Sequence, residues 1–262
     1  MTETTTQATA SVPAYAPGVP LWVDLGASNV QDAVRFYGQL FGWDAEDMGE
    51  EAGHYTMLRQ TGKMVAAVGP LMNPQQPPAW STYICTRDAA ATAQAVKDGG
   101  GQVLMEPMAV MGAGTMAVFS DPSGAVFSVW QPAAHPGAEL TNTPNSLCWN
   151  ELHTRDLPAA KTFYPRVFGW GVQANPMPQG GAYVEWQVAG RSIAGGTAMD
   201  STYPPQVPPF WLVYFAVADC DATASRAQEL GASLVVPPMD IPQGRFAILS
   251  DPQGATFGII RL

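Results

Sequence analysis

The chain has 262 residues, which is long for one domain and comfortable for two. Its formal net charge is −10, and because an acidic surface repels phosphate backbones, we expect no nucleic-acid partner. Its apolar runs are too short for a membrane helix, and its three scattered cysteines are typical of reduced thiols, so we expect a cytoplasmic protein with no membrane partner. Only 13% of the residues are charged, which favours an unusually apolar surface, such as a homodimer interface or a large pocket.

The first predicted elements are a strand over 21–25 and a helix over 30–41, where apolar residues recur at helical spacing. Ser28 followed by Gln31 predicts the N-cap of this helix, because the two side chains can satisfy free backbone donors reciprocally. Gly42 is expected to end the helix, since a left-handed residue at a helix C-terminus favours glycine.

Short strands follow, separated by turn residues. Thr61-Gly62 predicts a hairpin turn between two of them, and Pro77-Pro78 interrupts the chain before the pattern starts again. The second module has a helix over 88–98 and three strands, the last two joined by Asp-Pro-Ser-Gly at 121–124, which suits a type I turn. Each module therefore runs strand, helix and three strands, or βαβββ.

The second half of the chain repeats the first. The phrase Phe-Tyr-x-x-x-Phe-Gly-Trp stands at 36–43 and at 163–170, and Asp-Pro-x-Gly at 121–124 and 251–254. The same elements recur in the same order, which indicates an internal duplication. We expect the aromatic residues of both phrases to belong to the core, because large aromatics on one helix face more often pack than bind.

The predicted organisation is a disordered tail at 1–15, a first domain at 16–131, a linker at 132–145 and a second domain at 146–262. The tail lacks the pattern of a secretory signal. The linker is rich in Pro, Ala, Asn and Thr and poor in large apolar residues. The expected fold class is α+β, with four tandem βαβββ modules.

Four such modules, with the aromatic phrase after the first helix of each half and Asp-Pro-x-Gly before its last strand, resemble the vicinal oxygen chelate superfamily. This is the glyoxalase, bleomycin-resistance and extradiol dioxygenase group, and within it the chain resembles two-domain glyoxalase-like or "hydroxylase" proteins of actinomycetes. The resemblance covers residues 20–262. It implies two glyoxalase-like domains, each an eight-stranded cup that usually holds a divalent metal.

The resemblance also implies where the metal ligands would stand on the first, fifth and eighth strands of each half. Other residues hold those positions here: Trp22, Thr82, Ser128, Trp149, Val213 and Gly258. Indole, valine and glycine cannot replace the imidazole, thiolate or carboxylate that such cations need. We therefore expect no metal and no cofactor.

Strand alternation predicts what lines the cups instead. If Trp149 points into the second cup, Glu151 and His153 do too, and Tyr183 and Glu185 join them from a later strand. The matching residues of the first half are Trp22, Asp24, Tyr55, Met57, Ser128 and Trp130.

An imidazole beside carboxylates suits acid–base chemistry, so Glu151, His153 and Glu185 are the candidate catalytic residues. The candidate ligand-binding residues are Trp149, Tyr183, Trp22, Asp24, Tyr55, Met57, Ser128 and Trp130. The alternative is that the acidic residues and the histidine are satisfied polar groups, with Asp24 and Glu151 holding a backbone amide. We expect His54 and His135 to be surface residues.

Three functions remain open, in this order. The first is a metal-independent protein that binds a flat aromatic or apolar small molecule, since Trp and Tyr are good stacking surfaces. The second is a tailoring enzyme of aromatic polyketide metabolism, either an acid–base catalyst or a protein that accompanies a hydroxylase. The third is a metal-dependent lyase or dioxygenase with relocated ligands. We expect the second cup to be the main site and the first to be a weaker or structural copy.

Overall fold

The computed structural model describes residues 15–177 and 180–262, so all of the predicted tail but Tyr15 lies outside the described residues. The elements of the first half are β1 (Pro20–Ala27), α1 (Val30–Phe41), β2 (Asp44–Asp47), β3 (Thr56–Gln60), β4 (Lys63–Pro70), β5 (Ala79–Cys85), α2 (Ala89–Asp98), β6 (Gln102–Val110), β7 (Gly114–Ser120) and β8 (Val126–Pro132). Those of the second half are β9 (Ser146–Thr154), α3 (Leu157–Phe168), β10 (Gly171–Pro176), β11 (Ala182–Val188), β12 (Arg191–Ala198), β13 (Phe210–Ala216), α4 (Cys220–Glu229), β14 (Ser233–Ile241), β15 (Gly244–Ser250) and β16 (Thr256–Arg261).

Each half forms one eight-stranded sheet from two βαβββ modules, which confirms the predicted α+β fold. The strand orders are β2-β3-β4-β1-β5-β8-β7-β6 and β10-β11-β12-β9-β13-β16-β15-β14. The first strands of the two modules, β1 with β5 and β9 with β13, pair antiparallel at the centre of each sheet. The exact domain limits, 16–131 and 146–262, stay a prediction.

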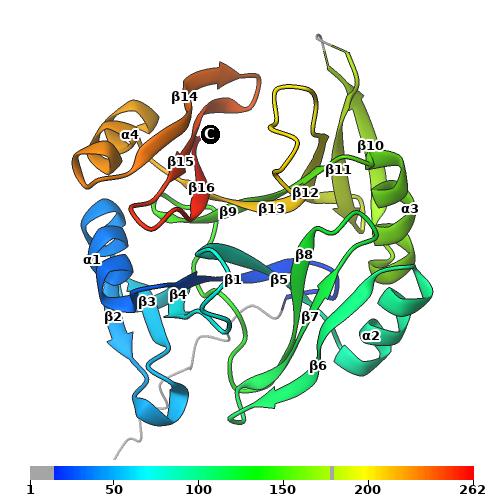
Figure 1. Ribbon diagram of the computed structural model, residues 1–262, viewed down its shortest axis with the longest axis horizontal. Coiled ribbons are helices and arrows are strands. Elements are labelled where there is room, and N and C mark those ends of the chain that lie inside the picture. Colours follow the sequence, from blue (N-terminus) through cyan, green and yellow to red (C-terminus); the bar gives the residue numbers. More distant parts are fainter. Residues whose placement is uncertain (1–14, 178–179) are drawn as a thin grey trace, which may run out of the picture.

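The two sheets lie one above the other, with α1 and α4 together on one side and α2 and α3 together on the other (Figure 1). One core cluster joins α1, β1 and β4 to β13, α4 and β16, and a second joins α2 and β8 to α3 and β11. Both clusters therefore contain residues of both halves. The cups lie on the opposite faces of the sheets, away from this shared core.

The repeated aromatic phrase holds the two halves together reciprocally. Tyr37 donates a hydrogen bond to the carboxylate of Asp251 at 3.0 Å, and Tyr164 donates one to Asp121 at 3.0 Å. Each aspartate opens the Asp-Pro-x-Gly turn of the opposite half. The predicted core role is confirmed for the buried residues Phe36, Tyr37, Phe41, Trp43, Phe163, Tyr164 and Trp170.

The tryptophan of each phrase makes a second reciprocal contact. Trp43 Nε1 donates to the carbonyl of Asn145 at 2.8 Å, just before β9, and Trp170 Nε1 donates to the carbonyl of Gly18 at 2.8 Å, shortly before β1. Each phrase thus fixes the chain that enters the first strand of the other half.

The caps of α1 confirm one prediction and correct another. Gly42 is the C-cap, with the left-handed φ of 72° that was expected. The N-cap is Asn29 rather than Ser28, because Asn29 has the extended backbone and its side chain accepts from Asp32 N at 3.1 Å. Ser28 instead donates to Gln253 of the other half at 2.6 Å.

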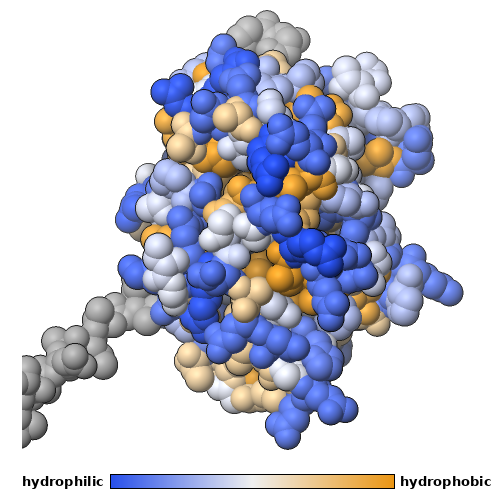
Figure 2. All heavy atoms as spheres, turned by 90° about the vertical axis from the view of Figure 1, so that its left-hand side faces the viewer, coloured by the Kyte–Doolittle hydropathy of each residue, from blue (hydrophilic) through white to orange (hydrophobic). Residues whose placement is uncertain are grey.

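The surface that carries α1 and α4 is mostly hydrophilic, with apolar patches between the polar side chains (Figure 2). The outward positions of α1 include Gln31, Asp32, Arg35 and Gln39. Among the described residues, no helix has both the length and the apolar character needed to cross a membrane.

Candidate functional site

The second cup contains a chain of hydrogen bonds that centres on Glu151. Trp149 and Glu151 are two positions apart on β9, so both side chains point to the same face of the sheet. Tyr183 accepts a hydrogen bond from Trp149 Nε1 at 2.9 Å and donates one to Glu151 Oε2 at 2.6 Å. Tyr214 on β13 donates to Glu151 Oε1 at 3.3 Å. The structure thus brings together three of the predicted residues and adds Tyr214.

His153 lies at the inner end of this chain. Its Nε2 is 3.0 Å from Glu151 Oε1, which places the imidazole within ion-pair distance of the carboxylate. Its Nδ1 is 2.8 Å from the Tyr203 hydroxyl, and its ring stacks on Phe210 with centroids 4.6 Å apart. The side chains of His153 and Glu151 are only 4% and 13% exposed. They therefore form a nearly dry acid–base pair.

The surroundings of Glu151 favour its charged form. Burial alone would raise its pKa, but the neighbouring His153, with the Tyr183 and Tyr214 hydroxyls, outweighs burial and holds the pKa of Glu151 below its usual range. Burial and the Glu151 charge raise the pKa of Tyr203 to about 12. Burial and Glu151 also raise the pKa of Tyr183, so these phenols stay protonated hydrogen-bond donors at neutral pH.

The first cup repeats the same frame. Trp22 Nε1 donates to Tyr55 at 3.2 Å, and the hydroxyls of Tyr55 and Tyr83 donate to Asp24 Oδ2 at 3.0 and 2.9 Å. Gly26 occupies the position equivalent to His153, so β1 places no histidine beside this carboxylate. Burial raises the pKa of Asp24 to about 6, and the tyrosine hydrogen bonds offset only part of that effect. Hydroxyl groups hold both carboxylates, and no backbone amide donates to either one among the described residues.

The other predicted first-half residues also lie in the first cup. Met57 packs against its apolar lining, and Ser128 is paired in register with Tyr83. Trp130 Nε1 donates to the carbonyl of His135 at 2.8 Å.

The prediction that His135 is a surface residue is wrong. The residue is half-buried, both of its ring nitrogens are buried, and its ring lies edge-on to Trp22 with centroids 4.5 Å apart; burial lowers its pKa to about 4. The linker is polar in composition but folds into the first cup, which no local pattern reveals. His54, by contrast, is an exposed surface residue that pairs with Asp47.

Glu185 does not join the Glu151–His153 pair. It faces the same side of the sheet, but one carboxylate oxygen accepts from Asn175 at 2.8 Å and the other from the Ser192 hydroxyl. No hydrogen bond or ion pair links Glu185 to the pair within the described parts of the chain.

Sequence reasoning missed four residues of the cups. Tyr83 and Tyr214 are paired in register with Trp22 and Trp149, and so face the cups. The neighbouring Thr82 and Val213, which the resemblance placed there, lie on the opposite face of the sheets. Thr82 donates to Asn150 at 2.8 Å in the shared core between the halves. The other two, Tyr203 and Phe210, lie in or just after a proline-rich loop without periodicity.

Comparison with known proteins agrees with this architecture. Residues 20–129 and 147–259 each match the family described as the Glyoxalase/Bleomycin resistance protein/Dioxygenase superfamily. The chain belongs to this superfamily. It is 42% identical over 263 residues to the anthracycline biosynthesis protein DnrV of Streptomyces peucetius, covering 95% of this chain and 94% of that protein.

Two solved structures share the fold at low sequence identity. The Mn(II)-bound glyoxalase from Novosphingobium aromaticivorans aligns with a TM-score of 0.65 and 18% identity, over 94% of this chain and 82% of that one. The 2,3-dioxygenase LapB from Pseudomonas sp. KL28 aligns with a TM-score of 0.66 and 11% identity, over 94% and 93%. These likenesses establish the fold alone.

The residues in the cups do not fit the superfamily's usual metal site. No group of three or more His, Cys, Asp or Glu side chains is placed to hold a metal ion within residues 15–177 and 180–262. A Cβ at Gly258 would overlap the ring of Tyr214, and one at Gly195 would overlap the hydroxyl of Tyr183. Because catalytic zinc sites typically use three protein ligands, this phenol-rich donor set is a poor match for a resident cation.

Proposed function

We propose that this protein binds a planar, oxygenated aromatic molecule in its second cup without a metal ion. The observation that carries the proposal is the partly exposed Trp149 next to the buried Glu151–His153 pair. An indole face suits stacking, and a carboxylate held in its charged form accepts a hydrogen bond from a phenol. The Tyr203 hydroxyl can donate to a ligand carbonyl in return when His153 Nδ1 is the donor in their mutual contact.

The relative named for anthracycline biosynthesis supports the choice of ligand class. That protein is 42% identical to this chain along nearly the whole length of both. Anthracyclines contain a planar ring system that carries phenol and carbonyl oxygens. We infer that the ligand here is an aromatic polyketide of this kind, or its precursor, within secondary metabolism.

The test uses 1,4-dihydroxyanthraquinone as a probe, titrated into the purified protein by calorimetry with and without EDTA. We expect one equivalent to bind equally well in both conditions. Trp149→Phe should keep most of the affinity and Trp149→Ala should lose most of it, because the phenyl ring preserves a stacking face. Binding that disappears with EDTA and returns with added Mn²⁺ or Zn²⁺ would contradict metal independence.

A tailoring enzyme is the second candidate function, and the Glu151–His153–Tyr203 arrangement favours it. A histidine between a carboxylate and a phenol can accept a proton and pass it on. Incubating the probe with the protein in deuterated water tests this directly. Deuterium exchange into the probe, or a new product, that is seen with the unmodified protein and not with His153→Gln would favour an enzymatic function over a binding function.

A further inference from the structure

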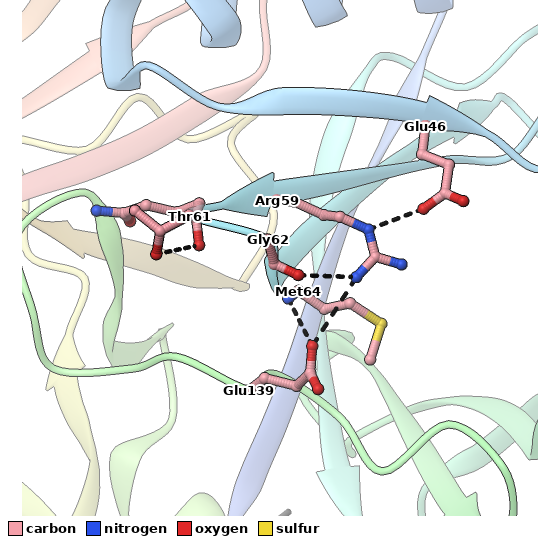
Figure 3. A network of polar contacts seen from close by, with 7 residues as sticks. Glu46, Arg59, Thr61, Gly62, Met64 and Glu139 are labelled. Atoms are coloured by element: carbon pink, nitrogen blue, oxygen red, sulfur yellow. Dashed lines mark hydrogen bonds and ion pairs between the residues drawn. The ribbon is translucent and has the colours of Figure 1, made fainter.

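The linker crosses the first cup and is fastened to the strands around it. Ala138 N donates to the carbonyl of Leu21 at 2.8 Å, and Glu139 N donates to the carbonyl of Met64 at 2.8 Å. The Glu139 carboxylate accepts in turn from Met64 N at 2.8 Å and lies 3.9 Å from Arg59 Nη1 (Figure 3). Glu139 is therefore the residue that fixes this end of the linker.

His135 contacts the first cup with its ring rather than with its ring nitrogens. The ring lies edge-on to Trp22 and 5.6 Å from Trp130, measured between centroids. Neither ring nitrogen has a hydrogen-bond partner among the described residues, although both are buried. The polar contact comes from the backbone, where the His135 carbonyl accepts from Trp130. An aromatic ring with a carbonyl oxygen beside it is what this cup holds.

The second cup has the same Trp, Tyr and carboxylate arrangement, but no linker segment lies over its tryptophan in the described part of the chain. Trp22 is only 3% exposed and Leu21 is fully buried, whereas the equivalent Trp149 and Cys148 are partly exposed. Ala138 of the linker belongs to the buried lining of the first cup, whereas the apolar cluster of the second consists of strand residues of its own half, and the loop residue Tyr203 reaches only His153 and not Trp149 in the contacts found among the described residues. The repeat therefore shows one frame with an aromatic occupant and one with an open face.

We infer that the first cup is a second aromatic-binding site, occupied by the protein's own linker, in which the His135 ring takes the place of a ligand's phenol ring. This inference rests on the proposed function of the second cup. By the repeat, it also locates the ligand ring there: against Trp149 and beside Ile260, which replaces Trp130.

The experiment removes the stand-in ring and its fastening together. The double variant His135→Gly with Glu139→Ala is compared with the unmodified protein in fluorine NMR titrations with millimolar 4-fluorophenol, a single ring of suitable size. We expect one bound population in the unmodified protein and two in the double variant. A crystal structure with 4-fluorophenol should show the added ring between Trp22 and Trp130. The milder His135→Ala serves if the double variant unfolds.

Phe119→Ala is the matched control, because it removes a fully buried ring from the core outside the cups. It should not add a second 4-fluorophenol population. A folded double variant without added binding would overturn the inference and leave the proposed function intact. Binding between Trp22 and Trp130 in the variant, with none in the second cup of either protein, would support the inference and refute the proposed function.

Discussion

Trp22 and Trp149 stand at equivalent positions of the repeat, and each donates to a tyrosine that in turn donates to a carboxylate. Around Trp22 the linker closes over the cup, and β1 has Gly26 where β9 has His153. Around Trp149 the face is partly open, and His153 holds Glu151 in its charged form. We propose that the duplicated frame serves structure in the first half and ligand binding in the second. Changing equivalent residues in the two cups tests this division.

The largest expected effect comes from replacing the two equivalent tryptophans, one of which should affect stability and the other probe binding. Trp22→Ala should lower the free energy of unfolding by about 3–5 kcal/mol, because it opens a cavity under the linker, and should leave probe affinity unchanged. Trp149→Ala should destabilise less, since Trp149 is partly exposed, and should weaken probe binding by about 1–3 kcal/mol, or roughly 5- to 150-fold. Urea unfolding and calorimetric titration of both variants measure the two quantities. If Trp22→Ala abolished binding and Trp149→Ala did not, the roles of the cups would be reversed.

The next effect concerns pH and the linker. The pKa of His135 falls from 6.5 to about 4 on folding, so the unfolded chain binds the extra proton between these values and stability is lost as the pH falls from about 6.5 to 4. His135→Phe keeps the ring and removes this loss. The variant should gain up to about 3 kcal/mol over the unmodified protein near pH 4, and much less at pH 8. Thermal unfolding across pH 4–8 measures the difference.

Asp24 lies in the same cup and titrates in the opposite sense. Its folded pKa is raised to about 6, so its contribution is present at low pH and is lost as the pH rises towards 6. Asp24→Asn with intact His135 is therefore the control for the previous experiment. A gain near pH 4 that also appeared in Asp24→Asn would not come from His135.

The two carboxylates should respond with opposite signs at pH 8. Asp24→Asn removes a buried charge whose raised pKa shows that ionisation is unfavourable, so we expect a gain of about 1–2 kcal/mol. Glu151→Gln removes a charge that its neighbours favour, so we expect a loss of about 1–2 kcal/mol. The Glu151 contribution is present above its ordinary pKa and is lost as the pH falls through the lower folded value. Equal signs in urea unfolding would mean that His153 does not distinguish the cups.

The sequence predicts the strand residues of the cups better than the residues that reach the cups from the linker and loops. Alternation along a strand is enough to place Trp22 beside Asp24 on β1 and Trp149 beside Glu151 on β9, because residues two positions apart lie on the same face of the strand. The same rule does not help on β5, because one face of this strand is buried in a cup and the other in the shared core. Polarity therefore does not show whether Thr82 or Tyr83 faces the cup. His135 and Tyr203 reach the cups from segments without regular structure. Their positions depend on distant contacts, which a local pattern does not contain.

The smallest expected effect concerns the shared core, where the two halves make equivalent contacts and should respond equally. Tyr37→Phe and Tyr164→Phe each remove one hydrogen bond to a buried aspartate of the opposite half, and both bonds are 3.0 Å long. The tryptophan that donates to each phenol, Trp80 at 2.9 Å or Trp211 at 3.0 Å, loses its acceptor in the same way.

Because phenylalanine keeps the ring, each variant should lose only about 1–2 kcal/mol of unfolding free energy. The two losses should agree within about 0.5 kcal/mol, and the double variant should lose about their sum, since the sites are distant. Neither change should alter probe affinity, because both lie in the shared core and not in a cup. Urea unfolding measures the losses, and probe titration is the control. A loss confined to one tyrosine would show that the asymmetry extends beyond the cups into the contacts between the halves.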